Sequence, residues 1–357
     1  MQSKRLMAVT GLLSATAIVL SACGTAAGSG GSESAQAGNN VIRIEYVHRL
    51  PDGPGMIPVT DMVEKWNAAH PNIQVTATRF TGKSSELMTK LKADVANKSA
   101  PCLAQVGYGE APEMFVGNLL EDVSGEASKY KDNYNDSAYS QMSVGGKMVG
   151  LPQDTGPLVY LYNEAEFNAL GIEVPKTFDE LLEAAKKAAA QGKYILDFEP
   201  DEVGYWLSAQ AAAAGAVWYS TVDNKWKINI TDEKTQAVAK FWQDALDAQA
   251  ALTHKRADDS YEQALTNGSL IGNIAPAWEI GYALDKLDGT PYEGQWRVAK
   301  LPTFGGARMT GPDGGSGVAV MKGCQHKTEA MEFNNWLNTQ VTDLTSQGLL
   351  PAAKGTV

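Results

Sequence analysis

The segment Gly146–Asn163, GKMVGLPQDTGPLVYLYN, decides how the rest of the chain is interpreted. Two short runs within it, Lys147–Leu151 and Pro157–Tyr162, are rich in Val, Leu, Met and Tyr, which suit a buried pleated surface. The break between them, Pro152–Pro157, carries two prolines, which remove backbone donors and stop the runs from forming one central strand. We therefore expect the chain to leave one sheet here and to enter another.

The polar residues of this break are Gln153 and Asp154. If the break links two lobes, both side chains face the cleft between the lobes. A surface loop between two strands of a single sheet is the alternative, and composition alone does not separate the two.

Length and charge narrow the classes of protein that the chain can represent. The 357 residues exceed one ordinary core and suit two lobes of about 150 residues each. Hydrophobic residues make up 44% and charged residues 20%, which is typical of globular proteins. The net charge of −11 lacks the basic excess of a nucleic-acid binder, so we expect no nucleic-acid partner.

The first 40 residues are expected to direct export rather than to fold. Lys4 and Arg5 precede a short apolar run, Leu12–Leu20, which is too short to span a bilayer. Leu20–Cys23 resembles a bacterial lipobox, which makes 1–23 a lipoprotein signal peptide and Cys23 the lipidated residue. Residues 24–40 are mostly Gly, Ser and Ala and predict a flexible linker. A plain secretory peptide that contains a cysteine is the alternative.

Strand and helix patterns alternate after residue 40. Strands are predicted at Val41–Val47, Ile73–Thr78 and Leu103–Val106, with helical stripes between them, which indicates parallel βαβ units. Ligands of open α/β sheets sit beyond the carboxyl ends of the strands. That rule selects the polar and aromatic residues that follow the first and third strands: His48, Arg49, Asp52, Tyr108 and Glu110.

The second half of the chain is predicted to be rich in helices. Thr177–Glu180 is a capping box that starts a helix running to about Ala190, and Thr231 is expected to cap a later one. Trp218–Ile230 suggests a small hairpin. Trp296–Leu301, followed by Pro302, is expected to be the crossing by which the chain returns to the first lobe.

Several segments together resemble one family. Gly146–Asn163, Lys176–Glu180, Trp66–Val75 and the glycine-rich turn Gly311–Gly317 are similar to the extracellular solute-binding proteins, family 1, of bacterial sugar ABC importers. The resemblance implies an α/β, two-lobe periplasmic-binding-protein-like fold of type II (maltose-binding-protein-like), each lobe a mixed sheet flanked by helices. It places lobe 1 at 41–152 and 302–357 and lobe 2 at 153–301, with part of lobe 2 missing beyond residue 357.

The same resemblance implies a function. The protein is expected to be a monomer that captures a sugar, such as an oligosaccharide, and delivers it to an ABC permease in the membrane. With the lipid anchor it would sit on the outer face of the cytoplasmic membrane of a Gram-positive bacterium. A secreted lipoprotein enzyme acting on glycans, and a sensor or adhesion lipoprotein with the same fold, are the alternatives.

Catalytic patterns are weak. The four histidines are scattered without the spacing of metal ligands, and no glycine-rich phosphate loop is followed by lysine. Ser316 lies one residue away from the nucleophile-elbow pattern. We therefore expect no enzyme, no metal and no cofactor.

Sugar binding calls for other residues. Flat aromatic rings stack on the apolar faces of pyranoses, and carboxylate and amide groups pair with the hydroxyls. Trp66, Trp242 and Trp336 lie on helical stripes and are assigned to cores. Gly315 allows close approach of the backbone to a ligand. The remaining candidates for ligand contact are Trp206, Trp218, Trp278, Tyr282 and Ser316.

The resemblance also implies a disulfide. In the resembled fold the strand that returns to lobe 1 lies antiparallel beside the third strand. Cys102 precedes that third strand and Cys324 follows the returning strand Val318–Met321, so the two would meet. Two unrelated buried thiols are the alternative.

Overall fold

A computed structural model describes residues 41–53, 55–223, 225–306 and 309–355 of the chain. The predicted lipidation site Cys23, the signal peptide 1–23 and the linker 24–40 lie outside the described residues. In the part of the chain that is described, no helix is both long enough and apolar enough to cross a bilayer.

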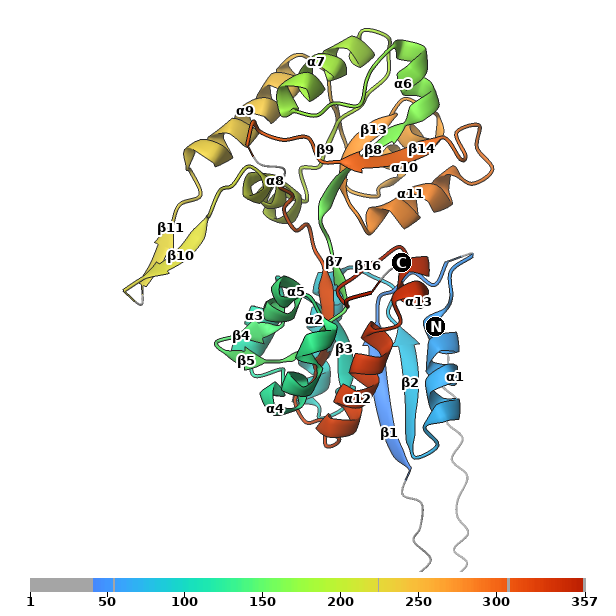
Figure 1. Ribbon diagram of the computed structural model, residues 1–357, viewed down its shortest axis with the longest axis vertical. Helices are drawn as coiled ribbons and strands as arrows, with labels where there is room; N and C mark the ends of the chain where they lie inside the picture. The colour runs from blue at the N-terminus through green and yellow to red at the C-terminus, as the bar shows by residue number, and fades with distance from the viewer. Residues whose placement is uncertain (1–40, 54, 224, 307–308, 356–357) are drawn as a thin grey trace, which may run out of the picture. The chain divides into compact units, whose positions relative to one another are not determined.

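The first sheet has five strands in the order β2-β1-β3-β15-β6 (Figure 1). Strand β1 runs parallel to β2 and to β3, which confirms the predicted βαβ units. Strand β15 enters from far along the chain and pairs antiparallel with β3 on one side and β6 on the other. The strand bounds are β1 Ile42–His48, β2 Ile73–Arg79, β3 Leu103–Gly107, β6 Gly150–Pro152 and β15 Ser316–Val320.

Helices from both ends of the described chain cover this sheet. One of the helical stripes predicted between the strands lies on α1, where Val59, Met62, Val63 and Trp66 are all buried. Helix α12 packs beside β6 and β15. The helices are α1 Val59–Ala69, α2 Ser84–Ala96, α3 Ala111–Val116, α4 Ser124–Ala127, the 3₁₀ turn η1 Ser128–Asn133, α5 Asp136–Gln141, α12 Lys327–Asn338 and α13 Val341–Ser346.

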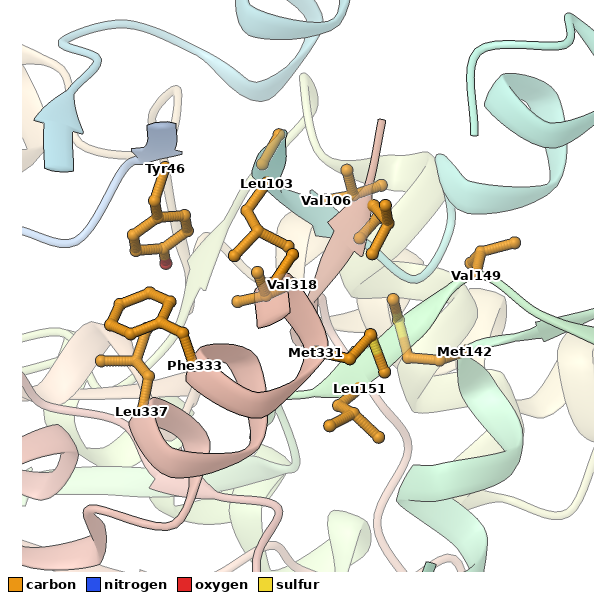
Figure 2. Close-up of a cluster of buried hydrophobic side chains, with 14 of the residues drawn as sticks. Tyr46, Leu103, Val106, Met142, Val149, Leu151, Val318, Met331, Phe333 and Leu337 are labelled. Atoms are coloured by element: carbon orange, nitrogen blue, oxygen red, sulfur yellow. The ribbon is translucent and has the colours of Figure 1, made fainter. Parts of the chain in front are cut away.

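The first core joins side chains that are far apart in sequence. Figure 2 shows Tyr46 of β1, Leu103 of β3, Val318 of β15, and Phe333 and Leu337 of α12 facing one another. All five are buried. The core of the first sheet is therefore incomplete until residues beyond 316 are in place.

The second sheet has three antiparallel strands in the order β13-β8-β14. They are β8 Leu158–Asn163, β13 Gly272–Pro276 and β14 Trp296–Lys300. Around them lie α6 Glu164–Leu170, α7 Phe178–Ala189, the π-helical turn η2 Val203–Leu207, α8 Ser208–Ala213, α9 Glu233–Asp247, α10 Asp259–Thr266 and α11 Glu279–Leu287. A second core, separate from the first, includes the predicted core residue Trp242.

Four two-stranded ladders complete the described structure. One is the predicted hairpin, β10 Tyr219–Val222 with β11 Lys225–Ile228. The others pair β4 Ser143–Val144 with β5 Lys147–Met148, β9 Asp197–Phe198 with β12 Leu252–Thr253, and β7 Asp154–Thr155 with β16 Leu350–Pro351.

Two sequence-based expectations need correction. Trp296–Lys300 is not a crossing between sheets, because it forms the edge strand β14 and pairs with β8 along its whole length. The chain returns to the first sheet only at Ser316. Helix α9 is capped by Asp232, whose side chain accepts from the N–H of Thr235, and not by Thr231. The capping box at Thr177 is confirmed.

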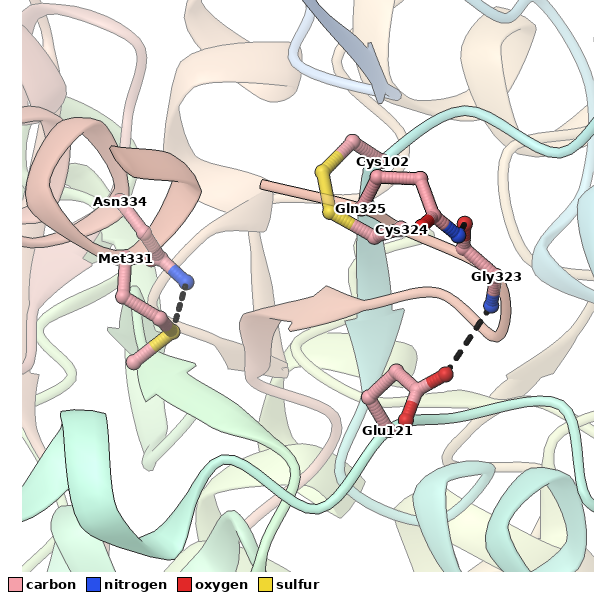
Figure 3. Close-up of a disulfide and its surroundings, with 7 residues drawn as sticks. All are labelled: Cys102, Glu121, Gly323, Cys324, Gln325, Met331 and Asn334. Atoms are coloured by element: carbon pink, nitrogen blue, oxygen red, sulfur yellow. Dashed lines mark hydrogen bonds between the residues drawn. A yellow bond between two sulfur atoms is a disulfide. The ribbon is translucent and has the colours of Figure 1, made fainter. Parts of the chain in front are cut away.

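The predicted disulfide between Cys102 and Cys324 is present (Figure 3), with Cα atoms 4.7 Å apart. It follows from the register of β15 on β3, in which Val320 lies opposite Leu103. The turn that carries Cys324 is fixed by Glu121, whose carboxylate accepts from the N–H of Gly323. The bond joins the early and late segments of the first core.

Loss of this bond is expected to destabilise the protein. The cysteines are 222 residues apart, and closing so long a loop in the unfolded chain corresponds to roughly 5 kcal/mol by loop entropy. Reductant should therefore lower the melting temperature of the wild type but not that of a Cys102→Ala, Cys324→Ala double variant. Equal melting of reduced and oxidised wild type, with the bond's state confirmed by mass, would contradict this expectation.

Candidate functional site

Two segments that join the sheets run side by side. We call Pro152–Pro157 and Pro312–Ser316 the crossing segments. The N–H of Gln153 donates to the carbonyl of Ser316 at 2.8 Å, and the N–H of Asp313 donates to the carbonyl of Gly156 at 2.7 Å. The two paths between the cores are thus held to each other by backbone hydrogen bonds.

Asp154 ties the crossing segments together through its side chain. Its Oδ1 accepts from the backbone N–H of Ser316 at 2.8 Å and from the Ser316 hydroxyl at 2.6 Å. Burial raises the pKa of Asp154 to about 6, although the hydrogen bonds from Ser316 act in the opposite direction. The carboxylate is therefore ionised at pH 7.

Gln153 attaches the same segment to the first core. Its side chain is fully buried, and its Nε2 donates to Oδ1 of Asn338 at 3.0 Å and to the hydroxyl of Tyr46 at 3.4 Å. Its Oε1 has no hydrogen-bond partner among the described residues. Both residues predicted to face a cleft are thus engaged with protein groups in this structure.

Tyr108, in the loop after β3, packs on the crossing segments, at residues 313–316, which we call the crossing turn. Its hydroxyl donates to the carbonyl of Asp154 at 2.7 Å, and its backbone N–H donates to the carbonyl of Gly315 at 3.2 Å. Gly315 has φ +89°, and a Cβ there would lie 2.9 Å from the ring of Tyr108. Only glycine fits this position without a shift.

Trp278, at the start of α11, contacts the other side of the same turn. Its indole Nε1 donates to the carbonyl of Asp313 at 2.9 Å, and the Arg256 guanidinium lies 5.5 Å from the centre of its ring. The residue is only partly buried. A partly exposed indole fixed along one edge can serve as a platform for a sugar ring.

Polar groups without partners gather at the carboxyl end of β1. His48 is buried, and burial lowers its pKa to about 4, so the imidazole is neutral at pH 7. Its Nδ1, and Nε of Arg49, lack hydrogen-bond partners among the described residues. The backbone N–H of Arg49 donates to the side-chain carbonyl of Gln105 at 2.7 Å, and Gln105 Nε2 donates to the Ser316 hydroxyl at 3.0 Å, so the end of β1 is linked to the crossing turn. Buried polar groups without a hydrogen-bond partner are rare in folded proteins.

Asp52 and Glu110, the two carboxylates after strands β1 and β3 that were predicted to contact a ligand, make local contacts with the protein. Asp52 Oδ1 accepts from the N–H of Val59 at the start of α1 and from the amide of Gln347. Glu110 accepts from the N–H of Gly107 at 2.9 Å, in the turn that precedes α3. In this structure both side chains stabilise turns.

Three aromatic residues that were predicted to contact a ligand make their hydrogen bonds away from the crossing segments. Trp206 has no exposed surface and its indole donates to the carbonyl of Ile274, so it belongs to the second core and offers no face to a ligand. Trp218 donates to the hydroxyl of Thr235, and the Tyr282 hydroxyl donates to the carboxylate of Glu262. Among the described residues, no hydrogen bond joins Trp218 or Tyr282 to the crossing segments.

A buried ionic cluster that no sequence pattern predicted lies next to Trp278. Arg256 pairs with Glu199 at 2.7 Å and with Asp313 at 2.6 Å, and also lies within 3.6 Å of Glu279 and 3.5 Å of Glu202. No local pattern marks Arg256, because Glu199 and Asp313 are each 57 residues away in sequence. Of these residues, only Asp313 could have been recognised from the sequence, because it lies in the predicted glycine-rich turn Gly311–Gly317.

Glu199 carries a proton at neutral pH. Burial, and then the charge of Glu279, raise its pKa to about 9, while Arg256 acts in the opposite direction. The unfolded chain releases this proton near pH 4.5, whereas the folded chain retains it up to about pH 9. Glu199 therefore makes the free energy of unfolding fall as the pH rises through this window, by at most about 1.4 kcal/mol per pH unit.

Glu199→Gln should flatten this dependence, because glutamine cannot ionise. Relative to wild type, the melting temperature of the variant is expected to rise progressively from pH 5 to pH 9. Glu164→Gln, which alters an exposed carboxylate paired with Arg297, serves as the matched control. Parallel pH curves for wild type and Glu199→Gln would show that Glu199 is ionised in the folded protein.

Comparison with known proteins identifies the family of the chain. Residues 54–341 match the model of the bacterial extracellular solute-binding proteins, and the chain belongs to that family. The family consists of solute-binding components of transport systems and not of enzymes. Within the described residues, no group of three or more His, Cys, Asp or Glu could hold a metal ion.

Solved structures agree with this assignment. The chain is 51% identical to the galacto-N-biose-/lacto-N-biose I-binding protein of the ABC transporter from Bifidobacterium longum, in complex with lacto-N-biose, over 89% of this chain and 79% of that chain, with a TM-score of 0.85. It is 26% identical to the ABC transporter associated binding protein from B. animalis subsp. lactis Bl-04, in complex with beta-1,6-galactobiose, over 88% and 77% of the chains, with a TM-score of 0.73.

A more distant likeness concerns the fold alone. A maltose-bound protein of T. maritima is 18% identical over 88% of this chain and 82% of its own, with a TM-score of 0.71, which confirms the predicted maltose-binding-protein-like α/β fold.

A curated relative, a probable ABC transporter-binding protein of Deinococcus radiodurans, is 27% identical over 240 residues. That match spans 62% of this chain and 55% of the relative.

Proposed function

We propose that this protein is the sugar-binding component of an ABC importer and takes a neutral disaccharide or oligosaccharide. The observation that carries the proposal is the 51% identity, over most of the chain, to a structure that holds lacto-N-biose. The ABC permease is the proposed partner, and lipidation at Cys23 is the proposed means of holding the protein at the outer face of the membrane.

The chemistry around the crossing segments supports a neutral ligand. Trp278 offers a partly exposed ring, on which the apolar face of a pyranose can stack. The unpartnered atoms of His48 and Arg49 are buried and are not open to a ligand in this structure. An anionic ligand would approach a chain of net charge −11.

We propose that the two cores form two lobes that close on the ligand, with the crossing segments as hinge. Lobe 1 would comprise 41–152 and the segment from Ser316 onward, and lobe 2 the residues from 158 to 311. Closure about a few residues in connecting segments is a common transition in binding proteins. The ligand shifts the equilibrium only through better contacts in the closed state.

Isothermal calorimetry tests the ligand class. We expect lacto-N-biose or beta-1,6-galactobiose to bind with a Kd in the micromolar range or below, that is, at least about 8 kcal/mol. Amino acids, dipeptides and an acidic sugar such as glucuronic acid are the comparison ligands. Binding of an amino acid or peptide with no response to any neutral sugar would overturn the proposal.

Trp278 is the residue on which the proposed platform depends. Trp278→Ala should weaken sugar binding by roughly 1–3 kcal/mol, because one large apolar contact is lost. Trp218→Ala is the matched control, since Trp218 makes no hydrogen bond to the crossing segments. If both variants bind like the wild type while melting normally, Trp278 does not contact the ligand.

A further inference from the structure

Arg256 lies at the centre of a cluster of carboxylates drawn from three segments of the second half of the chain. Glu199 and Glu202 come from the segment before η2, Glu279 starts α11, and Asp313 belongs to a crossing segment. The Arg256 side chain is only 10% exposed. A single guanidinium thus connects parts of the molecule that are far apart in sequence.

The carboxylates of this cluster require a positive charge at the position of Arg256. The side chains of Glu279 and Asp313 are at most 2% exposed and face the Arg256 cation, and Glu199, which carries a proton, accepts from its Nε. Breaking a buried pair by removing one partner leaves an uncompensated charge, which is strongly unfavourable. Glu279 gains a second partner in the hydroxyl of Tyr261 at 2.9 Å.

The geometry of the guanidinium gives each contact a direction. Nε faces Glu199, while the terminal nitrogens face both oxygens of Asp313, at 2.6 Å and 3.5 Å. This planar fork can hold two carboxylates at a fixed angle, which a lysine ammonium cannot do. Arg256 therefore orients Asp313 as well as neutralising it.

Asp313 passes this orientation to the crossing segments. Its N–H donates to Gly156 of the other crossing segment, and its carbonyl accepts from the indole of Trp278. Three residues later Ser316 binds Asp154. The Asp313 side chain, held by Arg256, therefore anchors the residue whose backbone makes both contacts.

Trp278 is held by the same residues. The guanidinium of Arg256 lies 5.5 Å from its ring centre, within the range of a cation–π contact, and Asp313 accepts its indole N–H. Gly314, with φ +79°, allows the turn to approach, since a Cβ there would lie 3.2 Å from Nε1. The ring is thus fixed by Arg256 and by the residue that Arg256 orients.

We propose that Arg256 is a positioning residue that couples the indole of Trp278 to the crossing turn, so that ligand contact on Trp278 and movement of the crossing segments are linked. The inference rests on the proposed function, because it takes Trp278 as the sugar platform. Arg256 itself acts through Trp278 and Asp313 and makes no ligand contact in this scheme.

Arg256→Lys tests the proposal because it keeps the charge and removes the fork. The full chain is labelled with 5-fluorotryptophan, and the fluorine resonance of residue 278 is assigned by its absence in Trp278→Phe. We expect Arg256→Lys to shift this resonance without ligand and to weaken lacto-N-biose binding about tenfold. Arg297→Gln, which removes an exposed arginine of the same half, should change neither.

A double variant separates positioning from general loss of structure. If Arg256 acts through the indole, Arg256→Lys should cost less than twofold in affinity when Trp278 is already alanine. A full tenfold loss in that background, or an unshifted resonance in the single variant, overturns the proposal. Should Arg256→Lys fail to fold, Asp313→Asn tests the same link, with a shifted residue-278 resonance expected and an unshifted one overturning it.

The two proposals fail in distinguishable ways. If the wild type binds no sugar, the proposed function is wrong, yet the fluorine resonance still reports whether Arg256 positions Trp278. If the wild type binds lacto-N-biose and Arg256→Lys binds it equally well with an unshifted resonance, only the positioning role is wrong.

Discussion

The carboxylate of Asp154, buried against Ser316, is the contact on which the link between the two cores depends. It accepts both the backbone N–H and the hydroxyl of Ser316, at the point where β15 begins and the first crossing segment leaves β6. A buried charge is tolerated only where hydrogen bonds replace its water. Ser316 supplies them, and Gln105 then extends the network from Ser316 to the carboxyl end of β1.

Around this contact, glycine and aromatic residues decide how closely the segments approach. Gly315 meets Tyr108, which packs against the first core, and Gly314 meets Trp278 at the start of α11. A side chain at either glycine would push an aromatic ring away from the turn. The close packing at Gly314 and Gly315 therefore keeps the carboxylate of Asp154 buried, since outward movement of the crossing turn would admit water to it.

Much of the fold was predictable because its signals are local. The stripe of Val59, Met62, Val63 and Trp66 has helical periodicity, and the capping box at Thr177 lies within four residues. Burial of α1 and the start of α7 followed from such patterns alone. The disulfide and the two-sheet architecture needed the family resemblance, because strand β15 joins β3 from more than 200 residues away.

The misassigned features depend on contacts that no local pattern encodes. Trp206 lies at a helix start, as a cleft residue can, but its indole donates into the second core. Trp296–Lys300 looks like a link before proline, yet it pairs with β8. No sequence pattern marks Arg256, because its role depends on contacts with Glu199 and Asp313, which lie near it only in the folded chain.

The position of β15 within the first sheet also fixes an order of events during folding. This strand lies between β3 and β6, so the first core cannot close before residues 316–320 are available. The strands of the second sheet, by contrast, all fall between residues 158 and 300. Pairings of long sequence separation form late. A chain that emerges with its amino end first thus keeps the strands between residues 42 and 152 without a finished core until residues 316–320 have followed.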